Sequence, residues 1–191
     1  MRIGIFGGSF NPPHLMHKNI ALELIKNNYL DKVIYVPTGN SYNKANLVSE
    51  KNRYEMLKLM IDNNKYLEVS DYEFGELHYT YQTLDYFKDK YSSDEIYFIC
   101  GTDNLKQLNT WKNYLYILNN YKLIVIKRDN DNVLYILNNY DKEGKKILTL
   151  DIVSDTISST KIRNFIKEKG DVSNLVDAKV YKYILDNDLY R

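Results

Sequence analysis

The fold is decided near the N-terminus, where residues 2–17 read RIGIFGGSFNPPHLMH. Residues 2–6 have the composition of a β-strand, and Gly7 and Gly8 follow it directly. Apolar side chains then recur at helical spacing over residues 15–25. Glycines at such a turn let backbone N–H groups approach a ligand closely, and the positive end of the helix points to the same place. The stretch therefore predicts a strand, an anion-binding turn and a helix.

The rest of the chain alternates short β-type runs with longer amphipathic runs. Strands are predicted over residues 2–6, 33–36, 67–69, 96–100, 123–126 and 147–153. Helices are predicted over residues 15–25, from a cap at Ser49 to about residue 63, from a cap at Thr80 through Phe87, and over residues 161–169 and 178–185, with Gly170 as the C-cap between the last two. This alternation predicts an α/β fold, a parallel sheet with helices on both faces. Such sheets bind ligands at the carboxyl ends of their strands.

Length and composition indicate one globular domain. The chain has 191 residues, 44% of them hydrophobic and 27% charged, which is enough apolar material to fill a core. All three prolines precede residue 38, and no linker rich in proline, glycine or serine divides the chain. We expect a single domain over residues 1–191, in which the last two helices form a small C-terminal helical part.

Charge and cysteine content exclude several classes of protein. With 26 basic and 25 acidic residues, the chain has no bulk attraction for nucleic acid or an anionic membrane, so any phosphate binding must be local. The single cysteine, Cys100, cannot form an intramolecular disulfide. The longest apolar runs, such as residues 123–126, are far shorter than the roughly 20 residues of a membrane helix. We expect a cytoplasmic protein without nucleic-acid or membrane partners.

Two of the three histidines, His14 and His17, fall at the start of the first helix. Residues three apart lie on one helix face, so both side chains can reach a triphosphate. Two glycines after a strand also occur in ordinary turns, and two histidines also occur in partial metal sites. A metal held by the protein is not predicted, because no convincing third ligand lies nearby. The P-loop, the G-x-G-x-x-G fingerprint and the G-x-S-x-G elbow are all absent from the sequence.

A second motif lies near the C-terminus, where residues 157–163 read ISSTKIR. It combines hydroxyl groups with the start of a helix, and Lys161 and Arg163 fall in its first turn. Cations at a helix N-terminus oppose the helix dipole, and a bound anion removes that conflict. Ser159 or Thr160 would also be unremarkable as an ordinary N-cap.

These residues resemble a known family. GGSFNPPH-x-x-H at residues 7–17 and ISST-x-IR at residues 157–163 are similar to the two signatures of the nucleotidyltransferase superfamily. Further similarity to its bacterial nicotinate-nucleotide adenylyltransferase branch lies at Arg53-x-x-Met56, Tyr79-Thr80-x-x-Thr83-Leu84, Gly101-Thr102-Asp103, Trp111 and Arg128. The resemblance covers residues 2–185. It implies a Rossmann-like fold and a reaction in which ATP and nicotinate mononucleotide give deamido-NAD and pyrophosphate.

The resemblance also implies a role for individual residues. The catalytic residues would be His14, His17, Lys44 and Arg163. The nucleotide would be bound by Gly7, Gly8, Ser9, Phe10, Gly101, Asp103, Ile157, Ser158, Ser159 and Thr160. The acceptor would be bound by Tyr79, Thr80 and Trp111, with the tryptophan stacked on the pyridine ring. Mg²⁺ would be carried by the ATP phosphates rather than by a protein cage.

Several positions depart from the family pattern. Met16 replaces a glycine that lies close to the adenine, so its side chain should either crowd the base or pack beside it. The other departures are Ser41-Tyr42-Asn43, Phe74, His78 and Asp129-Asn130, most of them on the acceptor side. Two alternatives therefore stay open: a related transferase that uses another phosphate acceptor, and a nucleotide-binding protein without turnover.

Overall fold

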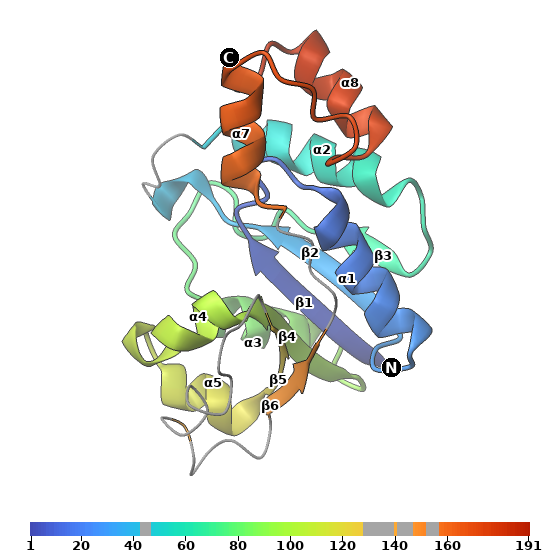
Figure 1. The fold of residues 1–191 in the computed structure, drawn as a ribbon. Helices are drawn as coiled ribbons and strands as arrows, with labels where there is room; N and C mark the ends of the chain where they lie inside the picture. The colour runs from blue at the N-terminus through green and yellow to red at the C-terminus, as the bar shows by residue number, and fades with distance from the viewer. Residues whose placement is uncertain (43–46, 128–139, 141–146, 152–156) are drawn as a thin grey trace.

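The computed structural model describes residues 1–42, 47–127, 140, 147–151 and 157–191 (Figure 1). Its centre is a parallel sheet of six described strands in the order β3-β2-β1-β4-β5-β6. The strands are β1 (Arg2–Gly8), β2 (Lys32–Pro37), β3 (Leu67–Val69), β4 (Glu95–Gly101), β5 (Lys122–Ile126) and β6 (Ile147–Leu150). The strand order reverses between β1 and β4, because the chain builds β2 and β3 on one side of β1 and then crosses to the other. The predicted α/β class with a parallel sheet is confirmed.

Helices cover both faces of the sheet, also as predicted. One face carries α1 (Leu15–Lys26), α2 (Glu50–Ile61), α7 (Ser159–Lys167) and α8 (Ala178–Asp186). The other carries α3 (Thr80–Lys90), α4 (Thr102–Gln107) and α5 (Tyr114–Asn120), while η1 (Asn40–Tyr42) and η2 (Leu108–Thr110) are single 3₁₀ turns. Successive side chains of a strand serve the two cores in turn: Ile124 packs in the first and Val125 in the second.

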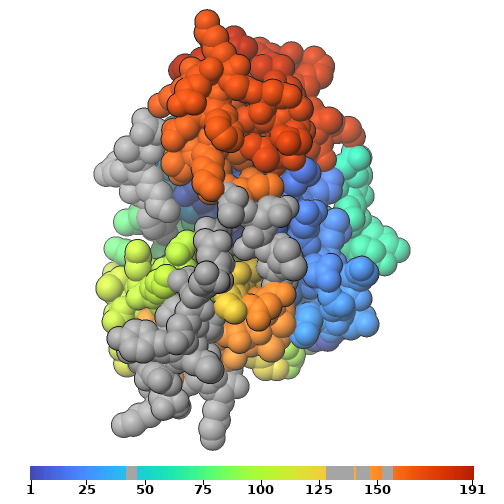
Figure 2. Space-filling view, viewed as in Figure 1, coloured from blue at the N-terminus to red at the C-terminus, as the bar shows by residue number. Residues whose placement is uncertain are grey.

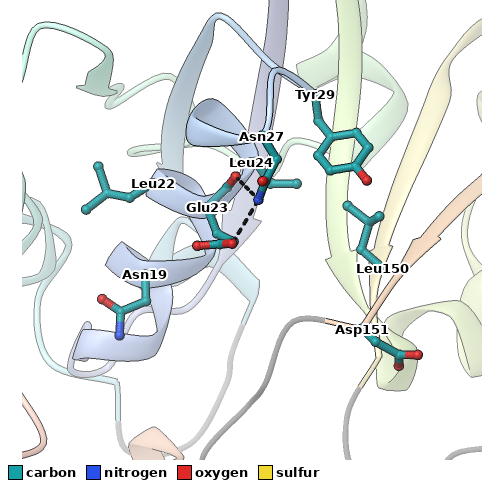
Figure 3. Close-up of a pocket in the computed structure, with 8 residues that line it drawn as sticks. All are labelled: Asn19, Leu22, Glu23, Leu24, Asn27, Tyr29, Leu150 and Asp151. Atoms are coloured by element: carbon teal, nitrogen blue, oxygen red, sulfur yellow. Dashed lines mark hydrogen bonds between the residues drawn. The ribbon is translucent and has the colours of Figure 1, made fainter.

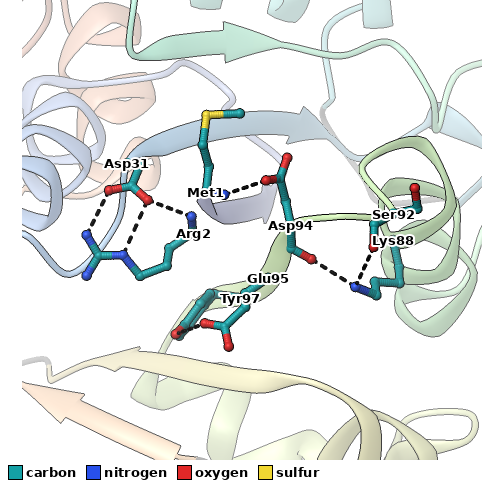
Figure 4. Close-up of polar contacts among 8 residues, drawn as sticks. All are labelled: Met1, Arg2, Asp31, Lys88, Ser92, Asp94, Glu95 and Tyr97. Carbon is teal, nitrogen blue, oxygen red and sulfur yellow. Dashed lines mark hydrogen bonds and ion pairs between the residues drawn. The ribbon is translucent and has the colours of Figure 1, made fainter.

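At the amino ends of the strands, charged groups pair with one another (Figure 4). Arg2 Nη2 lies 2.7 Å from Asp31 Oδ1, and the amino group of Met1 pairs with Asp94. Lys88 Nζ donates to the carbonyl oxygen of Asp94 at 2.8 Å. The carboxylates of Asp31 and Asp94 are thus paired within the fold, and ligands of parallel sheets bind at the opposite, carboxyl edge.

The pair of Arg2 and Asp31 makes stability depend on pH. Hydrogen bonds from Arg2 lower the pKa of the Asp31 carboxyl to about 2. A carboxyl with a lowered pKa in the folded state stabilises the fold above its unfolded pKa, and this contribution is lost as the pH falls through the folded pKa. We expect Asp31→Asn to lower the melting temperature by a few degrees at most at neutral pH, and the difference from wild type to shrink between about pH 4 and pH 2. A difference that persists unchanged to about pH 2 would contradict this assignment.

Two helices begin earlier than expected. Tyr79, not Thr80, is the N-cap of α3, because the side chain of Gln82 accepts the Tyr79 N–H at 2.9 Å and so supplies the cap. Helix α7 begins at Ser159 rather than at residue 161. Its N-cap is Ser158, whose hydroxyl accepts the Lys161 N–H at 3.3 Å, and so neither Ser159 nor Thr160, the alternative considered above, is the cap.

Gly170 follows α7 for a reason other than the expected one. The residue in the left-handed conformation is Lys169, with φ of 57°. The Gly170 N–H then donates to the carbonyl oxygen of Phe165 at 2.7 Å, and a Cβ at Gly170 would lie 3.1 Å from that oxygen. Glycine here provides room for a close approach rather than a positive φ.

The segment between β4 and β5 holds two helices that were not predicted. Helices α4 and α5 have six and seven residues, which is too short for an apolar period to be recognised. Strand β6 ends at Leu150, earlier than expected, and residues 152–156 lie outside the described residues.

Within the described ranges, no helix is both long and apolar enough to cross a lipid bilayer.

Candidate active site

A cavity of about 600 Å³ opens at the carboxyl ends of β1 and β4, beside the point where the strand order reverses. Ligands of parallel sheets bind in this position. The predicted site residues that line it are Gly7, Gly8, Ser9, Phe10, His17, Tyr79, Thr80, Gly101, Trp111 and Ser159. The structure therefore brings most of the predicted residues to one wall, although they come from distant parts of the chain.

The loop after β1 is held in an unusual conformation by aromatic packing. Phe10 has a φ of 46°, and its ring meets the His17 ring edge to face, with 4.9 Å between centroids. A Cβ at Gly8 would lie 3.2 Å from the Phe10 ring, so this glycine makes room for it. Such backbone strain persists only where the surroundings fix it, and it is common at functional sites. The loop is thus preorganised before any ligand binds.

The two histidines occupy different positions. His17 lines the cavity, whereas His14 is 3% exposed and lies behind it. Their rings stack with 3.7 Å between centroids, and the His14 N–H donates to His17 Nδ1 at 3.2 Å. Because Nδ1 of His17 accepts this hydrogen bond, the neutral ring carries its proton on Nε2. Nε2 is then the N–H donor of the neutral His17 ring.

The C-terminal motif contacts the loop after β1. Ser159 Oγ donates to the carbonyl oxygen of Pro12 at 2.8 Å, and Arg163 Nη1 donates to that of Asn11 at 2.8 Å. Arg163 Nη2 also donates to Thr160 Oγ1 at 3.2 Å. Ser159 is the member of this motif at the cavity wall. The predicted residues of this motif that do not line the cavity are Ile157, Ser158, Thr160 and Arg163.

The far end of the cavity combines an aromatic ring, a helix start and a cation. Trp111 packs edge to face against Phe98, with 6.0 Å between centroids, and it stays partly exposed. Tyr79 and Thr80 form the start of α3 at the same wall. Lys112 Nζ lies 4.4 Å from the centre of the Tyr79 ring, and it forms no ion pair within the described part of the chain. Lys112 was not predicted, although it directly follows the only tryptophan.

Asp103 does not line the cavity. Asp103 lies in the first turn of α4, just beyond Gly101, which does line the cavity. Lys44 lies outside the described residues, as does Arg128 of the family pattern. The roles of all these residues stay predictions.

Comparisons with known proteins agree with this geometry. A sequence model of the cytidylyltransferase-like family matches residues 5–165. A probable nicotinate-nucleotide adenylyltransferase of Clostridium novyi (strain NT) is 40% identical over 196 residues, which cover 98% of each chain. Another, from Fusobacterium nucleatum subsp. nucleatum, is 42% identical and covers 96% of this chain and 97% of its own. The chain belongs to the nicotinate-nucleotide adenylyltransferase family. The predicted family and enzyme class, a nucleotidyltransferase, are confirmed.

Solved structures support the fold of this adenylyltransferase family member. The nicotinic acid mononucleotide adenylyltransferase of Plasmodium falciparum, complexed with NaAD, superimposes with a TM-score of 0.85 at 23% identity, over 99% of this chain and 97% of that one. The same enzyme complexed with APC gives a TM-score of 0.82 at 22% identity. The predicted Rossmann-like fold is confirmed.

Met16, where the adenylyltransferase family has glycine, does not face the cavity. Its side chain is 6% exposed and packs in the core beneath α1 and α2, and it is not one of the residues that line the cavity. Residue 16 is the second residue of α1, and this helix turns it towards the sheet. Met16 is therefore a core residue in this structure, and the expectation that it crowds or flanks the adenine stays a prediction.

Two other departures from the family pattern also lie away from the cavity wall. Phe74 packs edge to face against Tyr54, with 5.9 Å between centroids. His78 packs against Tyr72, with 4.5 Å between centroids. Asn43, Asp129 and Asn130 lie outside the described residues.

Arg53, predicted only as part of the family pattern, supports the loop from beneath. It is fully buried and donates to the carbonyl oxygens of Ser9 at 3.0 Å and Val48 at 3.2 Å, and to Asn40 Oδ1 at 2.6 Å. Burial lowers its pKa below the ordinary value of arginine. Arg53 thus joins α2 to the loop after β1.

Glu73 is a buried carboxylate at the cavity wall that was not predicted. Its Oε1 accepts the Thr83 hydroxyl at 2.7 Å, which fixes it against α3. A Cβ at Gly39 would lie 2.1 Å from the Glu73 carbonyl oxygen, so this segment packs closely against the end of β2. An acidic residue in a loop is normally solvated, and for this reason its sequence gives no signal.

A second hollow lies between α1 and β6 (Figure 3). It is lined by Asn19, Leu22, Glu23, Leu24, Asn27, Tyr29, Leu150 and Asp151. The Asn27 side chain donates to Glu23 Oε1 there at 2.8 Å. None of its lining residues belongs to the family motifs, so we assign the active site to the first cavity.

Proposed function

We propose that the chain transfers the adenylyl group of ATP to nicotinate mononucleotide, giving deamido-NAD and pyrophosphate in the biosynthesis of NAD. The observation that carries this proposal is a single cavity with two chemically different ends. One end offers the loop after β1, His17 and Ser159, which suits phosphates. The other offers Trp111, the start of α3 and Lys112, which suits an aromatic acid. Membership of the family over nearly the whole chain supports the same reaction.

The chemistry needs no general base. A phosphate oxygen of the acceptor attacks the α-phosphorus of ATP, while the bond from that phosphorus to the departing pyrophosphate breaks. The second pKa of a phosphate monoester is about 6, so the attacking group is already largely dianionic at neutral pH. Catalysis then depends on positioning the reactants and stabilising the charge that develops on the leaving group.

The histidine pair supplies the central donor in this proposal. His17 donates from Nε2 to the phosphates, and His14 orients the His17 ring through its backbone N–H. Arg163 and Lys44 add positive charge on the leaving side. The nucleotide-binding residues are Gly7, Gly8, Ser9, Phe10, Gly101, Asp103, Ile157, Ser158, Ser159 and Thr160.

The acceptor end favours an acid over an amide. Trp111 stacks on the pyridine ring, and backbone N–H groups at Tyr79 and Thr80 donate to the nicotinate carboxylate. A helix N-terminus carries partial positive charge, which favours a carboxylate over a neutral carboxamide. Lys112, above the Tyr79 ring, adds a full positive charge at the same end.

The metal of this reaction is part of its substrate. Among the residues that the structure describes, no group of three His, Cys, Asp or Glu side chains comes together to hold an ion. We therefore propose that Mg²⁺ is bound by the ATP phosphates and by water, and that it arrives with the substrate as MgATP. The proposed substrates, MgATP and nicotinate mononucleotide, are both small molecules. The proposed use of ATP and the free, buried Cys100 support a cytoplasmic location.

Trp111→Ala tests the acceptor end. Loss of the stacked ring should raise the KM for nicotinate mononucleotide roughly tenfold, because stacked aromatic pairs contribute about 0.5–1.5 kcal/mol beyond area burial. The KM for ATP should change little, and it serves as the internal control. Steady-state kinetics with each substrate varied in turn makes the comparison. An equal increase in both constants would assign Trp111 to the fold instead.

A panel of substrates tests the proposed function itself. Nicotinate mononucleotide, nicotinamide mononucleotide and phosphopantetheine are each combined with ATP or CTP, and pyrophosphate release is measured. We expect the highest kcat/KM for nicotinate mononucleotide with ATP. A preference for phosphopantetheine or for CTP would identify a related transferase, and no release from any pair would leave a nucleotide-binding protein.

A further inference from the structure

The end of the chain reaches the loop that is proposed to bind phosphates. The hydroxyl of Tyr190, the residue before the last, donates to Asn11 Oδ1 at 2.9 Å. Tyr190 is 9% exposed and Asn11 is 3% exposed, so the contact is buried. Figure 2 shows the orange-red and red segments after residue 157 gathered at one end of the molecule, next to the blue N-terminal part. The contact also supports a single domain over residues 1–191.

Asn11 is a junction between three parts of the chain. Its Oδ1 accepts a second hydrogen bond, from the Val48 N–H at 3.2 Å, and its carbonyl oxygen accepts Arg163 Nη1 at 2.8 Å. Two donors on one oxygen fix the plane of the side-chain amide. Asn11 directly follows Phe10, whose ring packs on His17. A displacement of Asn11 would therefore move the ring that supports the cavity-wall histidine.

Tyr190 is itself held firmly. Leu189 and Tyr190 belong to the same hydrophobic core as Phe10, and Tyr190 has a φ of 67°. A left-handed conformation at a residue other than glycine is maintained only by strong surrounding contacts. Lys18 Nζ pairs with Asp177 at 3.0 Å and ties the start of α8 to α1. Burial raises the pKa of the Tyr190 phenol above its ordinary value, so it remains a donor.

We propose that Tyr190 is a positioning residue for the reaction. Its hydroxyl holds the Asn11 amide, and through Asn11 and Phe10 it holds His17 in place against the phosphates. The proposal rests on the proposed function for its effect on turnover, but the mechanical link between Tyr190 and the loop does not. Removal of the hydroxyl should loosen the loop after β1 without opening the core.

Tyr190→Phe is the test, and Tyr183→Phe is its matched control. Tyr183 lies on α8, shortly before Tyr190 in the chain, and its hydroxyl donates to Asn52 Oδ1 on α2 at 3.1 Å rather than to the loop. We expect Tyr190→Phe to lower kcat about five- to tenfold, the size expected for one buried hydrogen bond. Hydrogen exchange of the peptide that contains residues 9–14 should become faster. Tyr183→Phe should leave both quantities near the wild-type values.

A double variant shows whether Tyr190 acts through Asn11. Asn11→Ala combined with Tyr190→Phe should have the same kcat as Asn11→Ala alone, because the link is already broken. Unchanged exchange in Tyr190→Phe, equal losses in both tyrosine variants, or an additive double variant would each overturn the proposal. Wild-type protein that is inactive with nicotinate mononucleotide would refute the proposed function instead, and the exchange measurement would then decide the link by itself.

Discussion

His17→Ala is expected to lower kcat by at least about 100-fold while the protein stays folded. His17 is the predicted catalytic residue with a ring at the cavity wall, and its Nδ1 is occupied by the His14 N–H. In the proposed mechanism, Nε2 of His17 then donates to the phosphates. Removal of one preorganised donor to a transition state costs about 10²–10³ in kcat. Pyrophosphate release under saturating ATP and acceptor measures the loss.

His78→Ala is the matched control for this prediction. His78 is the third histidine of the chain, it packs against Tyr72, and it does not line the cavity. Its removal should change kcat by less than about threefold. Turnover of His17→Ala within threefold of wild type, with an unchanged melting temperature, would remove His17 from the mechanism.

Arg53→Leu is expected to lower the free energy of unfolding by roughly 3 kcal/mol. The substitution keeps an apolar side chain in the core but removes the donors to Ser9, Val48 and Asn40. Buried acceptors that lose their partners cost about 1–3 kcal/mol each, and part of this cost is relieved by water or by relaxation. Urea unfolding followed by circular dichroism gives the difference. Arg53→Lys should fall between wild type and Arg53→Leu, since lysine lacks the planar fork.

Arg2→Leu provides the comparison for a surface arginine. The Arg2 side chain is 36% exposed and pairs with Asp31 at the amino edge of the sheet. An exposed pair of this kind contributes little to stability. If Arg53→Leu and Arg2→Leu lost similar amounts of stability, the buried network around Arg53 would not hold the loop as described.

Local features of the sequence were sufficient for the first strand and the helix after it. Residues 2–17 contain a β-type run, two glycines and the start of an amphipathic run, and the structure has β1 and α1 there. The parallel sheet followed from the alternation of such units, because parallel strands need a crossover between them. Helices α4 and α5 escaped prediction, since neither is long enough to show a period.

The different positions of the two histidines could not be predicted from their spacing. A separation of three residues places both on one helix face, and only burial distinguishes the ring at the wall from the ring behind it. The start of α1 is fixed by a contact from far along the chain, in which the Leu15 N–H donates to the Leu175 carbonyl oxygen at 3.0 Å. The inward turn of Met16 depends on the same tertiary packing.

The positions of Lys112 and Tyr190 also could not be predicted from the sequence, because each depends on a contact between distant residues. The position of Lys112 above the Tyr79 ring joins the turn between η2 and α5 to the N-cap of α3. The hydrogen bond from Tyr190 to Asn11 spans 179 positions of the chain. No periodic pattern encodes either contact. The sequence motifs therefore predicted most of the residues around the cavity but neither Lys112 nor Tyr190.

The central claim is adenylyl transfer to nicotinate mononucleotide, and its direct test is the simultaneous measurement of both products. The protein is incubated with MgATP and nicotinate mononucleotide, deamido-NAD is quantified by mass spectrometry, and pyrophosphate is quantified in the same samples. We expect one deamido-NAD for each pyrophosphate, at a rate that His17→Ala lowers at least about 100-fold. Pyrophosphate without deamido-NAD, or neither product from folded protein, would contradict the proposed function.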